Sequence, residues 1–94
     1  MSAPKTDRAA VEEVLAAMET AGWKVVEVEG EYCTNPADAI MQIIDFDECR
    51  VYFQREEHVA GIMFVLDNSP EDVVCDYNVS LEPVIDPILD RWGR

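Results

Sequence analysis

The chain has 94 residues, of which 49% are hydrophobic, and it carries 20 Asp and Glu residues against 7 Lys and Arg. The net charge of −13 excludes a nucleic-acid-binding surface built on counterion release and argues against docking on anionic lipid. The apolar content is too high for intrinsic disorder, and the length fits one domain over residues 1–94. Composition therefore indicates a folded domain whose electrostatically favoured partners are basic.

The first half of the chain predicts a helix, a strand and a second helix. We expect residues 1–5 to be frayed, and Thr6 or Asp7 to cap a helix from Arg8 to Ala21 that ends at Gly22. The inner face of this helix consists of Val11, Val14, Leu15 and Met18. The alternation from Trp23 to Glu29 predicts a half-buried strand, with Val26, Val28 and Tyr32 on its inner side. Thr34, Asn35 and Pro36 then start a short helix to Ile44 that turns Ile40, Ile43 and Ile44 inward.

The second half predicts a hairpin followed by helices. Cys49 to Arg55 alternates, residues 56–58 form the turn, and the apolar run from Val59 to Leu66 is typical of a central strand covered on both faces. Pro70 begins a short helix through Asp76 that buries Val73 and Val74, and Ser80 caps a last helix that Pro87 kinks or divides. The order α-β-α-β-β-α-α predicts an α+β domain, in which helices cover a three-stranded, mainly antiparallel sheet.

Location is inferred from what the sequence does not contain. The first twenty residues include several charges and therefore do not resemble a signal peptide, and the longest apolar run is far too short to span a membrane. Cys33, Cys49 and Cys75 form no C-x-x-C pair and are interpreted as buried thiols in a reducing compartment. We therefore expect a cytoplasmic protein.

Residues suited to catalysis or metal binding are few. His58 follows two glutamates in a predicted turn, but no nucleophile is near it in sequence, so we interpret it as a solvated histidine. Asp45, Asp47 and Glu48 are oxygen donors of the kind that calcium or magnesium prefers, yet they lack the spacing of an EF-hand. Weak divalent binding remains open there. We expect no catalytic residues, no dedicated metal site and no cofactor. The aromatic residues are assigned to the core and sheet, and Trp92 to docking of the last helix.

The distribution of charge is more informative than any motif. Residues 27–48 contain seven acidic residues and no basic one, residues 67–94 contain seven acidic residues and two arginines, and the hairpin between them is neutral. On the predicted strand Glu27, Glu29 and Glu31 would point the same way at a pitch of about 6.6–6.8 Å, resembling the phosphates that a basic protein reads. The candidate partner-binding residues are Glu27, Glu29, Glu31, Asp45, Asp47, Glu48, Asp67, Glu71, Asp72 and Asp76.

The segment from Phe64 to Tyr77, with its Asn68-Ser69-Pro70-Glu71 start and its Val73, Asp76 and Tyr77, resembles a strand-and-cap segment of small acidic phage and prophage accessory proteins. The resemblance, which extends over about residues 20–80, implies an accessory role in a mobile element and no catalytic residues. Small acidic phage accessory proteins include inhibitors of host defence, such as anti-CRISPR proteins and DNA mimics, and no motif here singles out one of them. Two other interpretations remain open: an immunity-type or chaperone-type partner of a basic toxin or effector, and a small enzyme or metal-binding domain. We expect a non-catalytic inhibitor that binds a basic protein of the host cell and does not bind nucleic acid directly. The sequence does not fix the oligomeric state.

Overall fold

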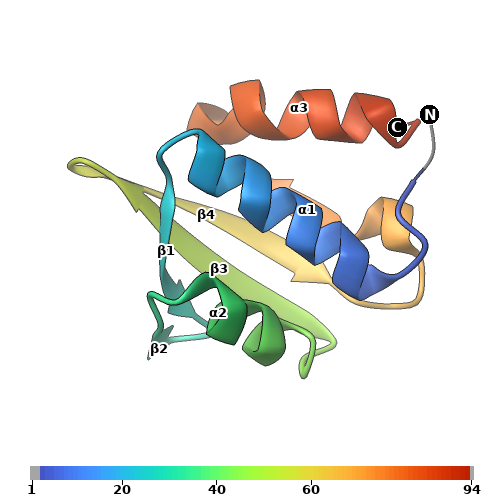
Figure 1. The fold of residues 1–94 in the computed structure, drawn as a ribbon, viewed down its shortest axis with the longest axis horizontal. Coiled ribbons are helices and arrows are strands. Elements are labelled where there is room, and N and C mark those ends of the chain that lie inside the picture. Colours follow the sequence, from blue (N-terminus) through green and yellow to red (C-terminus); the bar gives the residue numbers. More distant parts are fainter. Residues whose placement is uncertain (1–2, 94) are drawn as a thin grey trace.

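The computed structural model describes residues 3–93 (Figure 1), which form both helices and strands. In chain order they are α1 (Asp7–Thr20), β1 (Lys24–Val28), β2 (Glu31–Tyr32), α2 (Pro36–Ile43), β3 (Glu48–Arg55), β4 (His58–Val65), the 3₁₀ turn η1 (Pro70–Asp72), β5 (Val74–Tyr77), the 3₁₀ turn η2 (Val79–Leu81) and α3 (Glu82–Arg91).

The strands form one antiparallel sheet in the order β2-β1-β3-β4-β5, and the longest pairing joins β3 to β4 from Glu48↔Val65 to Arg55↔His58. The α+β class and the single domain are confirmed. The prediction of three strands was wrong, because the sheet has five among the residues that the structure describes. The two strands that the sequence pattern missed, β2 and β5, are short and lie at its two edges.

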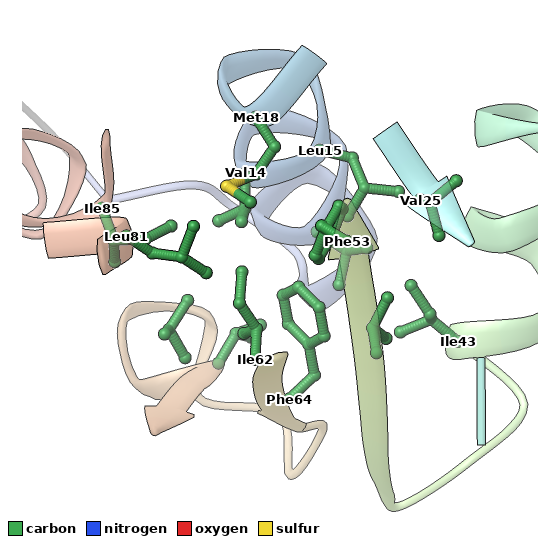
Figure 2. Packing of buried hydrophobic residues seen from close by; sticks show 14 of the residues in the cluster. Val14, Leu15, Met18, Val25, Ile43, Phe53, Ile62, Phe64, Leu81 and Ile85 are labelled. Atoms are coloured by element: carbon green, nitrogen blue, oxygen red, sulfur yellow. The ribbon is translucent and has the colours of Figure 1, made fainter. Parts of the chain in front are cut away.

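One face of the sheet and the helices that pack on it enclose the core. Strand residues Phe53, Ile62 and Phe64 point from this face toward α1, whose Val14, Leu15 and Met18 meet them, while Leu81 and Ile85 close one side (Figure 2). All of these side chains are buried. The sheet therefore has one covered face and one face without a helix across residues 3–93, and the prediction that β4 is covered on both faces was wrong.

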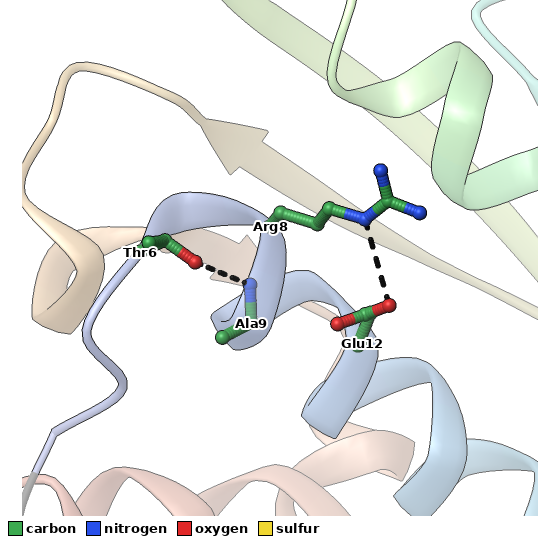
Figure 3. A network of polar contacts seen from close by, with 4 residues as sticks. All are labelled: Thr6, Arg8, Ala9 and Glu12. Atoms are coloured by element: carbon green, nitrogen blue, oxygen red, sulfur yellow. Dashed lines mark hydrogen bonds and ion pairs between the residues drawn. The ribbon is translucent and has the colours of Figure 1, made fainter.

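Helix α1 forms where the sequence predicts it. Thr6 is its N-cap and its hydroxyl oxygen accepts a hydrogen bond from the backbone N–H of Ala9 at 3.0 Å, while Arg8 and Glu12 form an ion pair of 3.6 Å one turn apart (Figure 3). Gly22 follows the helix with a φ of +89°, a conformation that glycine adopts at little cost. The fraying expected of residues 1–5 stays a prediction: Ala3 packs partly buried against the core, and residues 1 and 2 lie outside the described residues.

The segment between α1 and α2 corrects the predicted strand. Glu29 and Gly30 have φ values of +50° and +84°, so they form a tight two-residue turn and the chain reverses into β2. A bulge between Val25 and Glu27 shifts the alternation, which buries Val25 and Val28 in place of the expected Val26 and Val28. Tyr32, expected on the inner side, is 83% exposed because β2 lies at the edge of the sheet.

The last third of the chain differs in two further respects. Residues Val74 to Tyr77, predicted as the end of a helix, pair with β4 as strand β5, although Val73 and Val74 are buried as expected. Helix α3 runs unbroken through Pro87, and its N-terminus has no side-chain cap from Ser80. Trp92 is buried after α3 and its indole N–H donates to Glu13 at 3.2 Å, which confirms that it docks the last helix.

A candidate acidic interface

Three connections that are far apart in sequence lie along one end of the sheet. The β1–β2 turn lies against the start of β3, where the backbone N–H of Glu29 donates to the carbonyl oxygen of Arg50 at 2.8 Å. The α2–β3 turn lies against the end of β4, where the N–H of Leu66 donates to the carbonyl of Asp47, also at 2.8 Å. Figure 1 shows the beginning of β3 and the arrowhead of β4 together at this end. The β4–β5 connection starts from the same place.

Most of the predicted partner-binding residues lie on these connections. Together with the first residues of β2 and β3, which adjoin these connections, they form a group that we name the acidic end: Glu29, Glu31, Asp45, Asp47, Glu48, Asp67, Glu71 and Asp72. The other two candidates are elsewhere: Glu27 pairs with Tyr52 and Asp76 with Met63, within the uncovered face of the sheet. Folding therefore joins two acidic segments that are separated in sequence by the neutral hairpin.

The predicted row of Glu27, Glu29 and Glu31 along one strand does not exist. The turn at Glu29 and Gly30 places Glu31 on the neighbouring strand, so the even phosphate-like spacing is lost. Glu29 is also held in place: its carboxylate accepts a hydrogen bond from the backbone N–H of Arg50 at 2.7 Å. Part of the role of Glu29 is therefore to fix the β1–β2 turn against β3.

Cys49 lies buried beside this anchored carboxylate. Burial, the charge of Glu29 and a hydrogen bond to Glu29 together raise the pKa of the Cys49 thiol from 9.0 to about 12. A thiol with such a pKa is protonated and a poor nucleophile at neutral pH. Cys33 is buried as predicted, whereas Cys75, on the edge strand β5, is exposed and corrects the prediction of three buried thiols.

Asp7 is one acidic residue of this region that the sequence analysis did not select. It stands in the first turn of α1, and its carboxylate accepts a hydrogen bond from the backbone N–H of Asn68 at 3.0 Å. Its position at the start of a helix predicts a capping role. The sequence around Asp7 does not predict the contact with Asn68, which is distant along the chain. Asp7 thus ties α1 to the β4–β5 connection.

The other sites considered from the sequence do not assemble. His58 is exposed at the first position of β4, at the opposite end of the sheet. Within residues 3–93, no group of three or more His, Cys, Asp or Glu side chains is arranged to hold a metal ion. Phe46, assigned to the core, is 40% exposed in the turn before β3.

A hollow of about 150 Å³ lies between the end of α1, the start of β1 and the start of α2. Its walls are Leu15, Glu19, Trp23, Lys24, Val25, Thr34, Pro36 and Phe53. The Arg55 guanidinium stacks over the Trp23 ring at 4.5 Å from its centroid. The indole N–H of Trp23 is buried and has no acceptor among the described residues. None of the predicted site residues lines this hollow.

Comparison with known protein families, with characterised proteins and with solved structures found no match to this chain. In the part of the chain that the structure describes, no helix is long and apolar enough to cross a membrane.

Proposed function

We propose that this protein is a non-catalytic binding module that offers its acidic end to a basic protein. The observation that supports the proposal is that eight acidic residues lie along one end of the sheet, six of them on three connections and two at the first positions of β2 and β3. The net charge of −13 is well beyond the magnitude of about 2–8 that keeps a small domain soluble. Acidity concentrated at one place on a rigid sheet end is more than solubility requires.

The arrangement suits electrostatic recognition. Carboxylates clustered on one side of a protein attract a basic partner over a range of about one Debye length, and such attraction acts mainly on the association rate. The tight turn at Glu29 and the backbone bonds at Asp47 hold the acidic end in a defined shape before binding. A partner that normally binds phosphates with Lys and Arg would find carboxylates at neighbouring positions of a fixed surface.

The nature of the partner distinguishes the two leading interpretations. An inhibitor of a nucleic-acid-binding protein, a class that small acidic phage accessory proteins include, competes with nucleic acid for the same basic surface. An immunity-type or chaperone-type partner of a toxin or effector binds a basic surface that need not contact nucleic acid. Addition of duplex DNA to the complex separates them, because only the inhibitor is displaced by DNA.

The experiment begins with a pull-down from host lysate at low and moderate salt, followed by purification of each retained basic protein and titration against three forms of the chain. The first is the unmodified chain, and the second carries Asp45→Lys, Asp47→Lys and Glu48→Lys in the acidic end. The third is a control with Glu19→Lys, Glu56→Lys and Glu57→Lys, three exposed residues outside the acidic end: Glu19 lies in the last turn of α1, and Glu56 and Glu57 lie in the β3–β4 turn at the opposite end of the sheet. Both triple variants change the net charge equally, and circular dichroism checks that each is folded.

We expect the acidic-end variant to bind at least about tenfold more weakly than the control, with a shallower dependence on salt. Equal weakening by both variants would mean that net charge alone matters and would contradict a defined acidic interface. No weakening by either would contradict an electrostatic role altogether.

A further inference from the structure

The face of the sheet opposite the helices carries a second surface, which shares only Glu48 with the acidic end. We name it the open face. The register of the strands assigns to it Lys24, Glu27, Tyr32, Glu48, Arg50, Tyr52, Gln54, Val59, Gly61, Met63, Val65 and Asp76. Val25, Phe53, Ile62 and Phe64, which alternate with them along the three central strands, point the other way into the core between the sheet and α1 (Figure 2).

The centre of the open face is apolar. Tyr52 packs over Gly61, since a Cβ atom at that glycine would lie 3.0 Å from the tyrosine ring. Met63 and Val65 are half-buried beside this pair, and Val59 is 59% exposed. An antiparallel sheet can leave a polar face in water, but the centre of this face is apolar. Tyrosine, methionine and arginine are the residue types enriched in protein interfaces.

The charge of the open face differs from that of the rest of the molecule. It carries Lys24 and Arg50 against Glu27, Glu48 and Asp76, a net charge of −1 on a chain whose total is −13. The two signs are interleaved: Arg50 and Asp76 flank Met63 from the strands on either side. A basic partner gains little from a nearly neutral surface, whereas such a surface is complementary to a second copy of itself.

We propose that the open face binds the open face of a second copy of this chain and forms a twofold-symmetric dimer. Sheets pack face to face at about 10 Å, and a twofold contact needs the same self-complementary patch on both copies. Five strands at about 4.8 Å and central strands of about eight residues give a face of at most roughly 600 Å² in projection. That is at the small end of specific interfaces, so the dimer dissociates on dilution.

Salt distinguishes this dimer from the complex with a basic partner. Two copies with a charge of −13 each repel one another, and dissolved ions screen that repulsion. Added salt therefore strengthens the dimer, whereas it weakens the binding of the acidic end to a basic protein. The two proposals thus respond to salt in opposite directions, and either can fail without the other.

The test is sedimentation of the full chain over a range of protein concentrations, at low and at moderate sodium chloride. Met63→Lys places a charge at the centre of the open face, and Val59→Lys, at a more exposed position, keeps the test valid should the first variant fold poorly. The control is Met41→Lys, which makes the same change at a 52% exposed methionine on α2. Circular dichroism confirms that each variant is folded.

We expect the unmodified chain and the control to show a concentration-dependent dimer that salt strengthens at least several-fold. The Val59 and Met63 variants should remain monomeric over the same range. A chain that stays monomeric at every concentration and salt would overturn the proposal. So would a dimer that the control disrupts as strongly as the open-face variants, or one that salt weakens.

Discussion

Glu29 shows how one side chain can serve both the fold and the charge of a surface. Its φ of +50° is unusual for a residue with a side chain and costs about 1–2 kcal/mol relative to a right-handed conformation. Its carboxylate accepts the N–H of Arg50 and its own N–H donates to the carbonyl of Arg50, so the turn is held to β3 from both sides. A carboxylate placed there also raises the pKa of the neighbouring Cys49.

The raised pKa of Cys49 predicts a pH dependence of stability with a defined sign. The thiol has a pKa of about 12 in the folded chain against 9.0 ordinarily, so the folded state favours the protonated form. Its contribution to stability is fully present below pH 9.0 and is lost as the pH rises toward 12. Chemical unfolding at about pH 8 and about pH 10 should show a smaller free energy at the higher pH. Cys49→Ala should reduce that difference, and an unchanged difference would contradict the assignment.

The three thiols should also differ in their rate of modification. Cys75 is exposed on β5 and should react with a thiol reagent at the rate of a free cysteine, whereas Cys33 and Cys49 are buried. Cys49 should be the slowest, because its high pKa keeps the thiolate rare in addition to its burial. Mass spectrometry of peptides after timed labelling measures the rates of all three. Fast labelling of Cys49 in the folded chain would contradict its burial and its raised pKa.

At the scale of elements, the sequence predicts the helices and strands whose caps and apolar patterns lie within their own residues. The cap and apolar stripe of α1, the Asn35-Pro36 start of α2 and the alternation of β3 are complete within their own segments. The β1–β2 turn was missed because it has Glu29 where asparagine or glycine is usual, and a contact from Arg50 stabilises it. Strand β5 was missed because its pairing with the outer edge of β4, and not its own sequence, makes it a strand.

Helix α3 provides the element-scale prediction. Pro87 lies exposed inside the helix, lacks the N–H that would donate to the carbonyl of Pro83, and crowds the preceding turn. The helix nevertheless continues, because Ile85, Ile88 and Leu89 are buried in the core. Pro87→Ala should therefore stabilise the chain by about 1–3 kcal/mol in chemical denaturation. A loss of stability would contradict this expectation. It would mean that Pro87 stabilises the fold by lowering the conformational entropy of the unfolded chain, and that this effect exceeds its cost in the helix.

At the scale of the whole molecule, the sequence predicts the amount of acidity and the residues that carry it but not their arrangement. The counts for residues 27–48 and 67–94 identify two acidic segments, and the pairing of β3 with β4 then brings both to one end of the sheet. The open face could not be foreseen from the apolar run of β4, since a strand that is covered on both faces has the same pattern. Only the positions of the helices show which face is left uncovered.

The crowding of carboxylates at the acidic end predicts that salt stabilises the fold. Like charges within a Debye length repel, and that length falls from about 30 Å at 0.01 M to about 8 Å at physiological ionic strength. The thermal midpoint should therefore rise between low and moderate sodium chloride. A relief of about 1 kcal/mol corresponds to a rise of about 4–8 °C for a domain of this size. The melts are run at a protein concentration where the chain sediments as a monomer, so that dimer formation does not contribute.

A matched pair of variants separates repulsion at the acidic end from general effects of salt. Asp45→Asn with Asp47→Asn removes two charges from the acidic end, and Glu56→Gln with Glu57→Gln removes two from the β3–β4 turn at the other end of the sheet. The acidic-end pair should raise the midpoint at low salt and reduce its rise with salt, while the control pair should leave the salt response nearly unchanged. If both pairs behave alike, repulsion is spread over the whole surface and the acidic end is not its centre. If the midpoint falls as salt is added, ion pairs such as Arg91–Glu13, at 2.9 Å, outweigh the repulsion.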